Sequence, residues 1–277
     1  MENLNYEKVL EKIIKKTEDY IVSNRIKCMV LGISGGIDST LCAAICKEVS
    51  NNTGIPLIGR SLKIVNLNNE CKLAQEVGDT FCNNFKSINL WKAYSSVSGE
   101  FENNEGNGTS ISEGNIMARL RMMYLYNIAG IKKGIVIDTD NLTEHYLGFW
   151  TLHGDEGDFN PIGGLWKTEV YELSKYVAKR YNEWSYVMNK SIAAIPTDGN
   201  GISSSDLDQI GGKDYYEVDK ILIPFVEGIK AEDEIINDLI NSGFNEEVIK
   251  KILERYKNSE FKRKTSRVIK ISRDELL

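Results

Sequence analysis

The sequence has few of the residues that build disulfide frameworks and metal centres. It contains two histidines and five cysteines among 277 residues, and no two cysteines form a C-x-x-C pair. An odd number of cysteines without such a pair, beside so few histidines, indicates neither a disulfide scaffold nor a zinc site. We interpret the cysteines as reduced and mostly buried.

Long apolar runs and an excess of basic charge are missing as well. Residues 1–20 mix both charges without an uninterrupted apolar stretch, so we expect neither a signal peptide nor a membrane span, and predict a cytoplasmic protein. Acidic side chains outnumber basic ones by 40 to 34, giving a net charge of −6. This balance argues against a protein that coats nucleic acid or an anionic membrane, so we predict neither as a partner.

Apolar runs of strand length alternate with helical patterns along most of the chain. Residues 28–33 and 134–138 are continuous apolar runs, typical of strands buried on both faces of a parallel sheet. This alternation predicts an α/β fold, a Rossmann-like doubly wound parallel sheet. Further strands are expected at 56–59 and 87–90, and helices at 41–49, 69–85, 113–128 and 166–180.

We predict one domain over residues 1–277, in three parts. An amphipathic helix lies within 1–26, the nucleotide-binding core occupies 27–190, and a substrate loop with C-terminal helices fills 191–277. The C-terminal helices are expected near 214–222, 231–239 and 246–256. Glycine, asparagine and serine are dense in 95–112, which predicts a mobile loop, and 155–164 predicts a second, glycine-rich loop.

The turn Ser34-Gly35-Gly36-Ile37-Asp38-Ser39 lies between the first predicted strand and its helix. In such sheets the free N–H groups of a helix N-terminus bind phosphate, and glycines let the backbone approach it. Asp38 adds a hard oxygen ligand for Mg²⁺. The G-x-x-x-x-G-K-[ST] pattern is missing, so the turn is not the common P-loop. A purely structural glycine turn is the alternative.

The turn resembles the pyrophosphate-binding loop of the N-type ATP pyrophosphatases, the PP-loop family, which transfer AMP to an acceptor and release pyrophosphate. Later segments look like NAD synthetase, with the order kept from about Gly32 to Lys264. That family joins ammonia to deamido-NAD⁺ through an adenylated intermediate. The segments that carry the resemblance are 115–122, Asp138-Thr139-Asp140-Asn141-Leu142-Thr143-Glu144, 148–151, 154–161 and Leu165-Trp166-Lys167.

The resemblance implies roles for particular residues. ATP would be bound by Gly32, Ile33, Ser34, Gly35, Gly36, Ile37, Asp38, Ser39, Thr139, Lys167 and Thr197. Deamido-NAD⁺ would be bound by Arg119, Asp158, Phe261 and Lys262. Asp38 and Glu144 match the Mg²⁺ ligands, and the catalytic side chains would be Asp38, Lys167 and Asp155, the last as an acceptor of the ammonium proton.

Ordinary roles remain open for several of these residues. The alternative for Arg119 is a solvated or salt-bridged arginine, and that for Glu144 is a residue in the first turn of a helix. The basic segment 261–264 is equally typical of a solvated end. Lys167 could be a plain residue of a helix's first turn, although a cation is slightly unfavourable there.

The chain also departs from the family pattern. Leu152 stands where ammonia-dependent bacterial members often have a dinucleotide-contacting lysine, and the loop around it is about one residue shorter. Phe261 stands where many have histidine. Only about thirty residues precede the first predicted strand, too few for the amidohydrolase domain of glutamine-dependent members. We therefore expect free ammonia, or ammonia from a separate protein, as the nitrogen source, and a homodimer as in the family.

Two other functions stay open from sequence. One is another PP-loop ligase, such as a GMP synthetase ATPase subunit or a tRNA-sulfur transferase, although the latter generally needs paired cysteines and favours a basic surface. The other is a catalytically silent adenine-nucleotide sensor on the same fold. Asp38, Glu144 and Lys167 together argue against the sensor.

Overall fold

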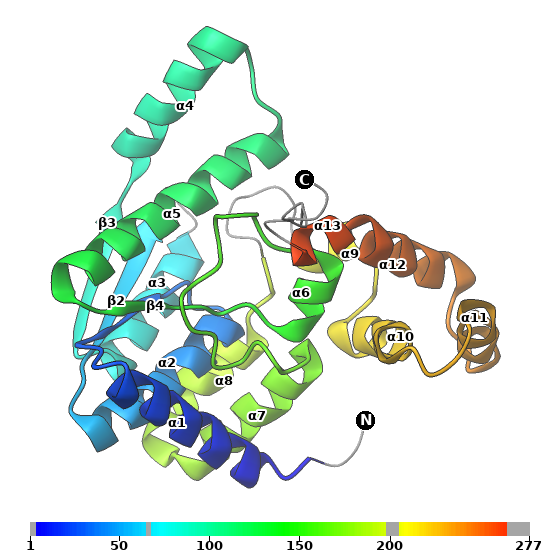
Figure 1. Ribbon diagram of the computed structural model, residues 1–277, viewed down its shortest axis with the longest axis horizontal. Coiled ribbons are helices and arrows are strands. Elements are labelled where there is room, and N and C mark those ends of the chain that lie inside the picture. Colours follow the sequence, from blue (N-terminus) through cyan, green and yellow to red (C-terminus); the bar gives the residue numbers. More distant parts are fainter. Residues whose placement is uncertain (1–3, 65–67, 198–204, 265–277) are drawn as a thin grey trace, which may run out of the picture.

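A computed structural model describes residues 4–64, 68–197 and 205–264. Its centre is a parallel sheet with the strand order β3-β2-β1-β4 (Figure 1). Met29 of the central strand β1 pairs with Leu57 of β2 and with Ile135 of β4. The strands are β1 (Met29–Gly32), β2 (Leu57–Lys63), β3 (Asn84–Asn89) and β4 (Ile135–Ile137).

Both faces of β1 are buried, as its apolar run predicts. Met29 and Leu31 belong to one hydrophobic cluster, whereas Val30 belongs to another, because successive side chains of a strand point to opposite faces. The first cluster packs against α1 (Tyr6–Ser23), α2 (Ile37–Thr53), α3 (Asn68–Phe81), α7 (Lys167–Arg180) and α8 (Ser185–Ala193).

The opposite face of the sheet is covered by α5 (Ser110–Lys132), with α4 (Trp91–Glu105) beside it (Figure 1). Leu125 and Ala129 of α5 pack on Val30 and Val136. Helices on both faces of a parallel sheet confirm the predicted doubly wound α/β class.

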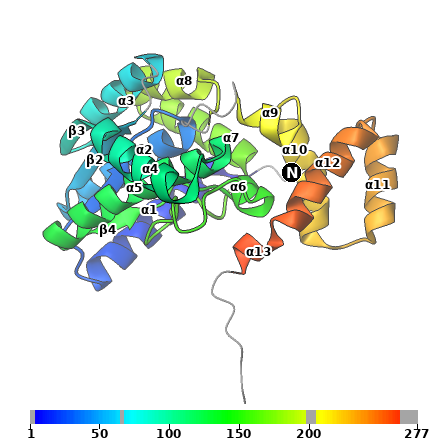
Figure 2. The ribbon, with the colours of Figure 1, turned by 90° about the horizontal axis from the view of Figure 1, so that it is seen from above.

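A hydrophobic cluster separate from those on the sheet lies in the C-terminal helices, which Figures 1 and 2 show grouped beside the sheet layer. It joins Val218 and Leu222 to Ile235, Leu239 and Ile252. The division of the chain into three parts of a single domain stays a prediction. The remaining helices are α6 (Leu142–Leu147), a 3₁₀ turn Asn182–Trp184, α9 (Asp206–Ile210), α10 (Tyr215–Glu227), α11 (Glu232–Asn241), α12 (Glu246–Asn258) and α13 (Glu260–Arg263).

The prediction of a loop over 95–112 was wrong. The helix α4 runs to Glu105, and α5 begins at Ser110. Tyr94 and Ser98, one helical turn apart on α4, both donate hydrogen bonds to Glu113 of α5. A polar composition predicts a loop only when no tertiary partner organises it, and here the half-buried carboxylate of Glu113 does so.

Two further boundaries differ from the sequence prediction. The helix expected over 69–85 ends at Phe81, and β3 starts at Asn84. Between them Asn83 accepts a hydrogen bond from the backbone N–H of Leu57, which fixes the start of β2 beside this turn. Residues 198–204 of the predicted substrate loop, and everything after 264, lie outside the described residues.

Gly35 is a position in the Ser34–Ser39 turn where the backbone requires a glycine. Its φ is +89°, and a Cβ there would lie 2.9 Å from the backbone N of Ala74 in α3. We predict that Gly35→Ala lowers the free energy of unfolding by about 1–3 kcal/mol, because both the left-handed φ and the close backbone disfavour a side chain. Urea unfolding measures the change.

The matched control is Gly130→Ala, in the interior of α5. A Cβ at Gly130 would meet no atom within 4 Å, so this variant should gain roughly 0.5–1 kcal/mol from helix propensity. Equal unfolding midpoints for the two variants would contradict the role given to Gly35.

Candidate active site

The turn from Ser34 to Ser39 lies where the sequence predicts it, between the end of β1 and the start of α2. Ser34 Oγ lies 2.9 Å from Ser39 Oγ and accepts a hydrogen bond from Gly36 N at 3.1 Å. Ser39 Oγ lies 3.1 Å from Gly36 O, to which it donates. These bonds hold the two hydroxyl groups at the N-terminus of α2, where backbone N–H groups favour anions.

The segment after β4 comes to the same place as this turn. Asn141 Nδ2 donates a hydrogen bond of 2.9 Å to Asp38 Oδ1. Asn141 also caps α6, accepting from Glu144 N at 3.0 Å, while Glu144 Oε2 accepts from Asn141 N at 3.2 Å. This reciprocal capping box fixes the direction of Glu144, and Asn141 ties it to the turn.

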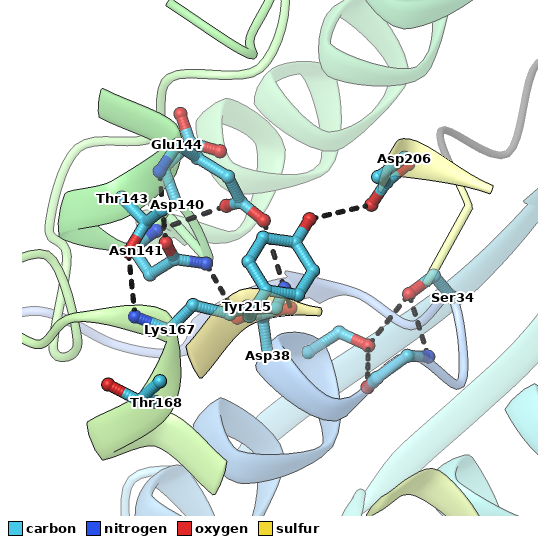
Figure 3. Close-up of polar contacts among 12 residues, drawn as sticks. Ser34, Asp38, Asp140, Asn141, Thr143, Glu144, Lys167, Thr168, Asp206 and Tyr215 are labelled. Carbon is cyan, nitrogen blue, oxygen red and sulfur yellow. Dashed lines mark hydrogen bonds and ion pairs between the residues drawn. The ribbon is translucent and has the colours of Figure 1, made fainter. Parts of the chain in front are cut away.

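Lys167, the first residue of α7, lies between the two acidic side chains (Figure 3). Its Nζ is 2.5 Å from Asp38 Oδ2 and 3.0 Å from Glu144 Oε1. The lysine side chain is 2% exposed. Three residues from three separate segments therefore form one buried charge cluster.

Burial and charge shift the protonation of this cluster in definite directions. Burial lowers the pKa of Lys167, but Asp38 and Glu144 outweigh it and hold that pKa well above its usual value. Burial raises the pKa of Glu144 to about 7, with Lys167 opposing the rise. Burial and the neighbouring Asp138 also raise the pKa of Asp140. The site thus has more carboxylates than its one buried lysine can neutralise, which favours an additional cation.

A cavity of about 560 Å³ opens over the charge cluster and is large enough for a nucleotide. It is lined by every residue that the sequence predicts for ATP, metal or catalysis. These are Gly32, Ile33, Ser34, Gly35, Gly36, Ile37, Asp38, Ser39, Thr139, Glu144, Asp155, Lys167 and Thr197.

Asp155 lines the same cavity and is held by the backbone. Its Oδ2 accepts a hydrogen bond of 2.6 Å from Thr151 N, and Thr151 Oγ1 donates to Asn115 on α5 at 2.8 Å. Burial raises the pKa of Asp155. A carboxylate with a raised pKa, facing a cavity, suits proton transfer near neutral pH.

The residues predicted for deamido-NAD⁺ are less concentrated. Lys262 lines the cavity, and its Nζ donates to Gly148 O at 2.7 Å and to Trp150 O. Arg119, Asp158 and Phe261 do not line it. Phe261 is 63% exposed. The dinucleotide roles of these four residues stay predictions.

Arg119 and Asp158 both hydrogen-bond to backbone atoms, and Asp158 also interacts with the side chain of Tyr126 on α5. Arg119 Nη2 donates to Leu152 O at 3.0 Å, so the position where Leu152 replaces the family's lysine is held by this arginine. Asp158 Oδ2 accepts from Val136 N at 2.8 Å, which satisfies the free edge of β4. Within this chain Asp158 therefore secures the glycine-rich loop to the sheet.

Sequence analysis gave no role to Asn141 or to Tyr215. The spacing Asn141-x-x-Glu144 is a capping pattern and could have located the helix start. Tyr215 lies on α10, and its ring centroid is 5.1 Å from Lys167 Nζ. No local signal connects residues 48 positions apart, so only the structure reveals this contact.

Replacing Lys167 should show how much two unpaired carboxylates destabilise the folded protein. We predict that Lys167→Met destabilises the protein by about 3–5 kcal/mol at pH 8, because two buried negative charges lose their cation. The loss should be smaller at pH 5. With a pKa of about 7, Glu144 binds a proton in the folded protein and contributes most stability at low pH, a contribution lost as pH rises through 7.

Urea unfolding of Lys167→Met and wild type at pH 5 and pH 8 measures this difference. Lys190→Met is the control, because Lys190 pairs with Glu76 at the surface, where the lysine is 37% exposed, and should matter little at either pH. A Lys167→Met penalty that does not grow with pH would contradict the charge balance described above.

Comparison with known proteins places this site in a family. The sequence matches the family profile described as NAD synthase over residues 9–266. The NH(3)-dependent NAD(+) synthetase of Fusobacterium nucleatum is 30% identical over 274 residues, which cover 98% of each chain. That of Thermococcus sibiricus is 31% identical and covers 95% of this chain and 97% of its own.

Solved structures agree with the sequence comparison. The NMN synthetase of Francisella tularensis superposes with a TM-score of 0.79 at 26% identity, covering 97% of this chain and all of its own. The NH3-dependent NAD synthetase of Campylobacter jejuni, solved with a nitrate ion, gives 0.72 at 26% identity, covering 96% and 100%. With a profile match over most of its length and full-length relatives at about 30% identity, the chain belongs to the NAD synthase family.

Proposed function

We propose that this protein is a ligase that amidates deamido-NAD⁺ to NAD⁺, using ATP and ammonia. The nicotinate carboxylate attacks the α-phosphorus of ATP and displaces pyrophosphate. Ammonia then attacks the activated carbonyl carbon, and AMP leaves with the electron pair of the broken C–O bond. Adenylation is needed because a free carboxylate would have to expel oxide.

One observation supports the nucleotide half of this reaction above all others. Lys167 Nζ lies in the cavity beside the Ser34–Ser39 turn, buried and held by Asp38 and Glu144. A fixed cation next to a helix N-terminus is suited to a triphosphate that loses pyrophosphate, because both stabilise the charge developing on the leaving group.

Mg²⁺ fits the carboxylate side of this cluster. Asp38 Oδ2 and Glu144 Oε1 lie 2.5 Å and 3.0 Å from the same lysine Nζ, so small side-chain movements would bring both oxygens to one ion. Within residues 4–64, 68–197 and 205–264, no group of three or more His, Cys, Asp or Glu side chains is arranged to hold a metal alone. Mg²⁺ is commonly held by one or two carboxylates plus substrate phosphates, and would here neutralise the triphosphate.

Asp155 is the proposed acceptor of the proton that ammonium must lose. It lies in the same cavity as Lys167, and its carboxyl is fixed by Thr151 N. Lys262 and Arg119 flank the loop that carries Asp155, through Trp150 O and Leu152 O respectively. With Asp158 and Phe261 they are the proposed contacts of the dinucleotide.

A mononucleotide acceptor is the second candidate. The likeness to the Francisella tularensis protein, whose title names NMN synthetase, favours testing it, since that structure covers nearly the whole chain. Deamidated NMN carries the same nicotinate carboxylate but lacks the adenosine half of deamido-NAD⁺. Leu152, at the position where relatives contact the dinucleotide, is consistent with a changed acceptor site.

A homodimer with α5 at its interface is also proposed. Four large apolar side chains of α5 are exposed, namely Ile111, Met123, Tyr126 and Ile131. Exposed apolar side chains spaced along one long helix suit a second copy of the chain better than water. None of the helices in the described part of the chain combines the length and the apolarity of a membrane span. A cytoplasmic location is the accompanying proposal.

The decisive assay mixes purified protein with ATP, Mg²⁺, ammonium and deamido-NAD⁺. We expect NAD⁺, AMP and pyrophosphate in equal amounts, and Asp38→Asn should lower the rate by about 10²-fold or more because it removes a group that organises the phosphate site. Asp79→Asn, on the exposed surface of α3, is the matched control. Product from deamidated NMN alone would replace the dinucleotide proposal by the mononucleotide one.

The role of Asp155 predicts a pH-dependent defect. At pH 7 most ammonia is protonated, so Asp155→Asn should slow amide formation strongly, whereas near pH 9 free ammonia should restore much of the rate. The rate of NAD⁺ formation at subsaturating ammonium, followed from pH 6.5 to 9.5, tests this. A profile parallel to that of wild type would remove Asp155 from the proton transfer.

A further inference from the structure

The first turn of α7 carries Lys167 but lacks a capping side chain of its own. Trp166 precedes the helix, and an indole has no oxygen to accept from the free N–H groups. A cation in the first turn of a helix is also unfavourable. Glu169 of the same turn accepts only from Trp166 N, at 2.9 Å, so Thr168 N still needs an acceptor from outside α7, and a further negative charge nearby would help to offset the lysine.

Asp219 of α10 provides both. Its Oδ2 accepts hydrogen bonds from Thr168 N at 2.9 Å and from Thr168 Oγ1 at 2.8 Å, and its Oδ1 accepts from Thr143 Oγ1 at 2.5 Å. Thr143 Oγ1 in turn accepts from Lys167 N at 2.9 Å. Asp219 is fully buried, so one carboxylate joins the starts of α6 and α7, which carry Glu144 and Lys167.

Tyr215 lies one helical turn before Asp219, on the same side of α10. It is 3% exposed, and its ring centroid is 5.1 Å from Lys167 Nζ. Its hydroxyl donates to Asp206 Oδ2 at 3.3 Å (Figure 3). The ring therefore packs on the lysine ammonium that Asp38 and Glu144 contact.

These contacts make α10 the support of the lysine. Two side chains from one turn of α10 support opposite ends of Lys167. Asp219 is hydrogen-bonded to the first turn of α7, which carries the lysine backbone, and the ring of Tyr215 packs on the lysine ammonium group. The same helix packs through Val218 and Leu222 into the hydrophobic cluster of α11 and α12. The position of Lys167 is thereby connected to the packing of the C-terminal helices.

We propose that Tyr215 and Asp219 are positioning residues for Lys167, through which the C-terminal helices hold the phosphate-binding lysine in its reactive place. This inference rests on the proposed function, because it assigns to Lys167 the contact with ATP phosphates. Small displacements of a catalytic group cost large factors in rate, so loss of this support should appear in kcat.

The test compares Tyr215→Leu with Tyr215→Phe. Tyr215→Leu removes the ring and should lower kcat by about tenfold to thirtyfold, the factor expected for a desolvated cation–π contact, with KM for the acceptor unchanged. Tyr215→Phe keeps the ring, loses only the bond to Asp206, and should stay within about threefold of wild type. An equal loss in both variants would overturn the role of the ring.

The chain contains a matched control for this pair. Tyr216, next in sequence, packs on Lys175 of α7 at 5.8 Å, but at the surface, where Tyr216 is 37% exposed. Tyr216→Leu should leave kcat within about twofold of wild type, because an exposed contact of this kind contributes little. An equal defect in Tyr216→Leu would show that α10 acts only through overall stability, and would overturn the proposal.

Asp219→Asn tests the second contact independently and nearly preserves shape. We expect this variant to have a lower kcat than wild type, and a cooperative urea unfolding curve would show that it is folded. An unchanged kcat in the folded variant would overturn the role of Asp219. Asp219→Asn also keeps the proposal testable if Tyr215→Leu does not fold.

The affinity for α,β-methylene-ATP with Mg²⁺, measured by calorimetry, separates this inference from the proposed function. If wild type binds the analogue but forms no NAD⁺, the proposed reaction fails while the positioning of Lys167 remains testable. We expect several-fold weaker binding by Tyr215→Leu, and wild-type binding by that variant would overturn the inference.

Discussion

The site depends on one buried lysine that is shared by two carboxylates. Asp38 comes from the start of α2, Glu144 from α6 and Lys167 from α7, and Asn141 hydrogen-bonds to both acidic residues. Burial makes this arrangement costly unless charges are paired. The requirement explains why so much neighbouring structure, from the capping box of Asn141 to the carboxylate of Asp219, serves to fix three side chains.

The sheet with its helices and the group of C-terminal helices contribute differently to that site. The sheet and its helices place the Ser34–Ser39 turn and the end of β4 at one edge, because parallel strands all end on the same side. The C-terminal helices instead approach the lysine from outside the sheet, through Tyr215 and Asp219. Residues of both parts line the cavity, among them Lys262, which donates to Gly148 O.

Most of the sheet and much of the nucleotide site were predictable from sequence. The apolar run 28–33 and the glycine turn after it are local signals, and local chemistry determines their form. The segment 91–105 shows the opposite case. Its Gly, Asn and Ser content indicates a loop, but contacts of Tyr94 and Ser98 with Glu113 organise it as a helix. Composition cannot reveal a partner that lies on another element.

By itself, the sequence determined the α/β class, the family resemblance and the candidate side chains for binding phosphate and metal, because each depends on residue type and short spacing. Only the tertiary structure decided that Lys167 joins Asp38 to Glu144, that Asp158 secures β4, and that Tyr215 packs on the lysine. These contacts join residues between 22 and 129 positions apart. Their formation depends on how the helices pack, a property that no local pattern of residues encodes.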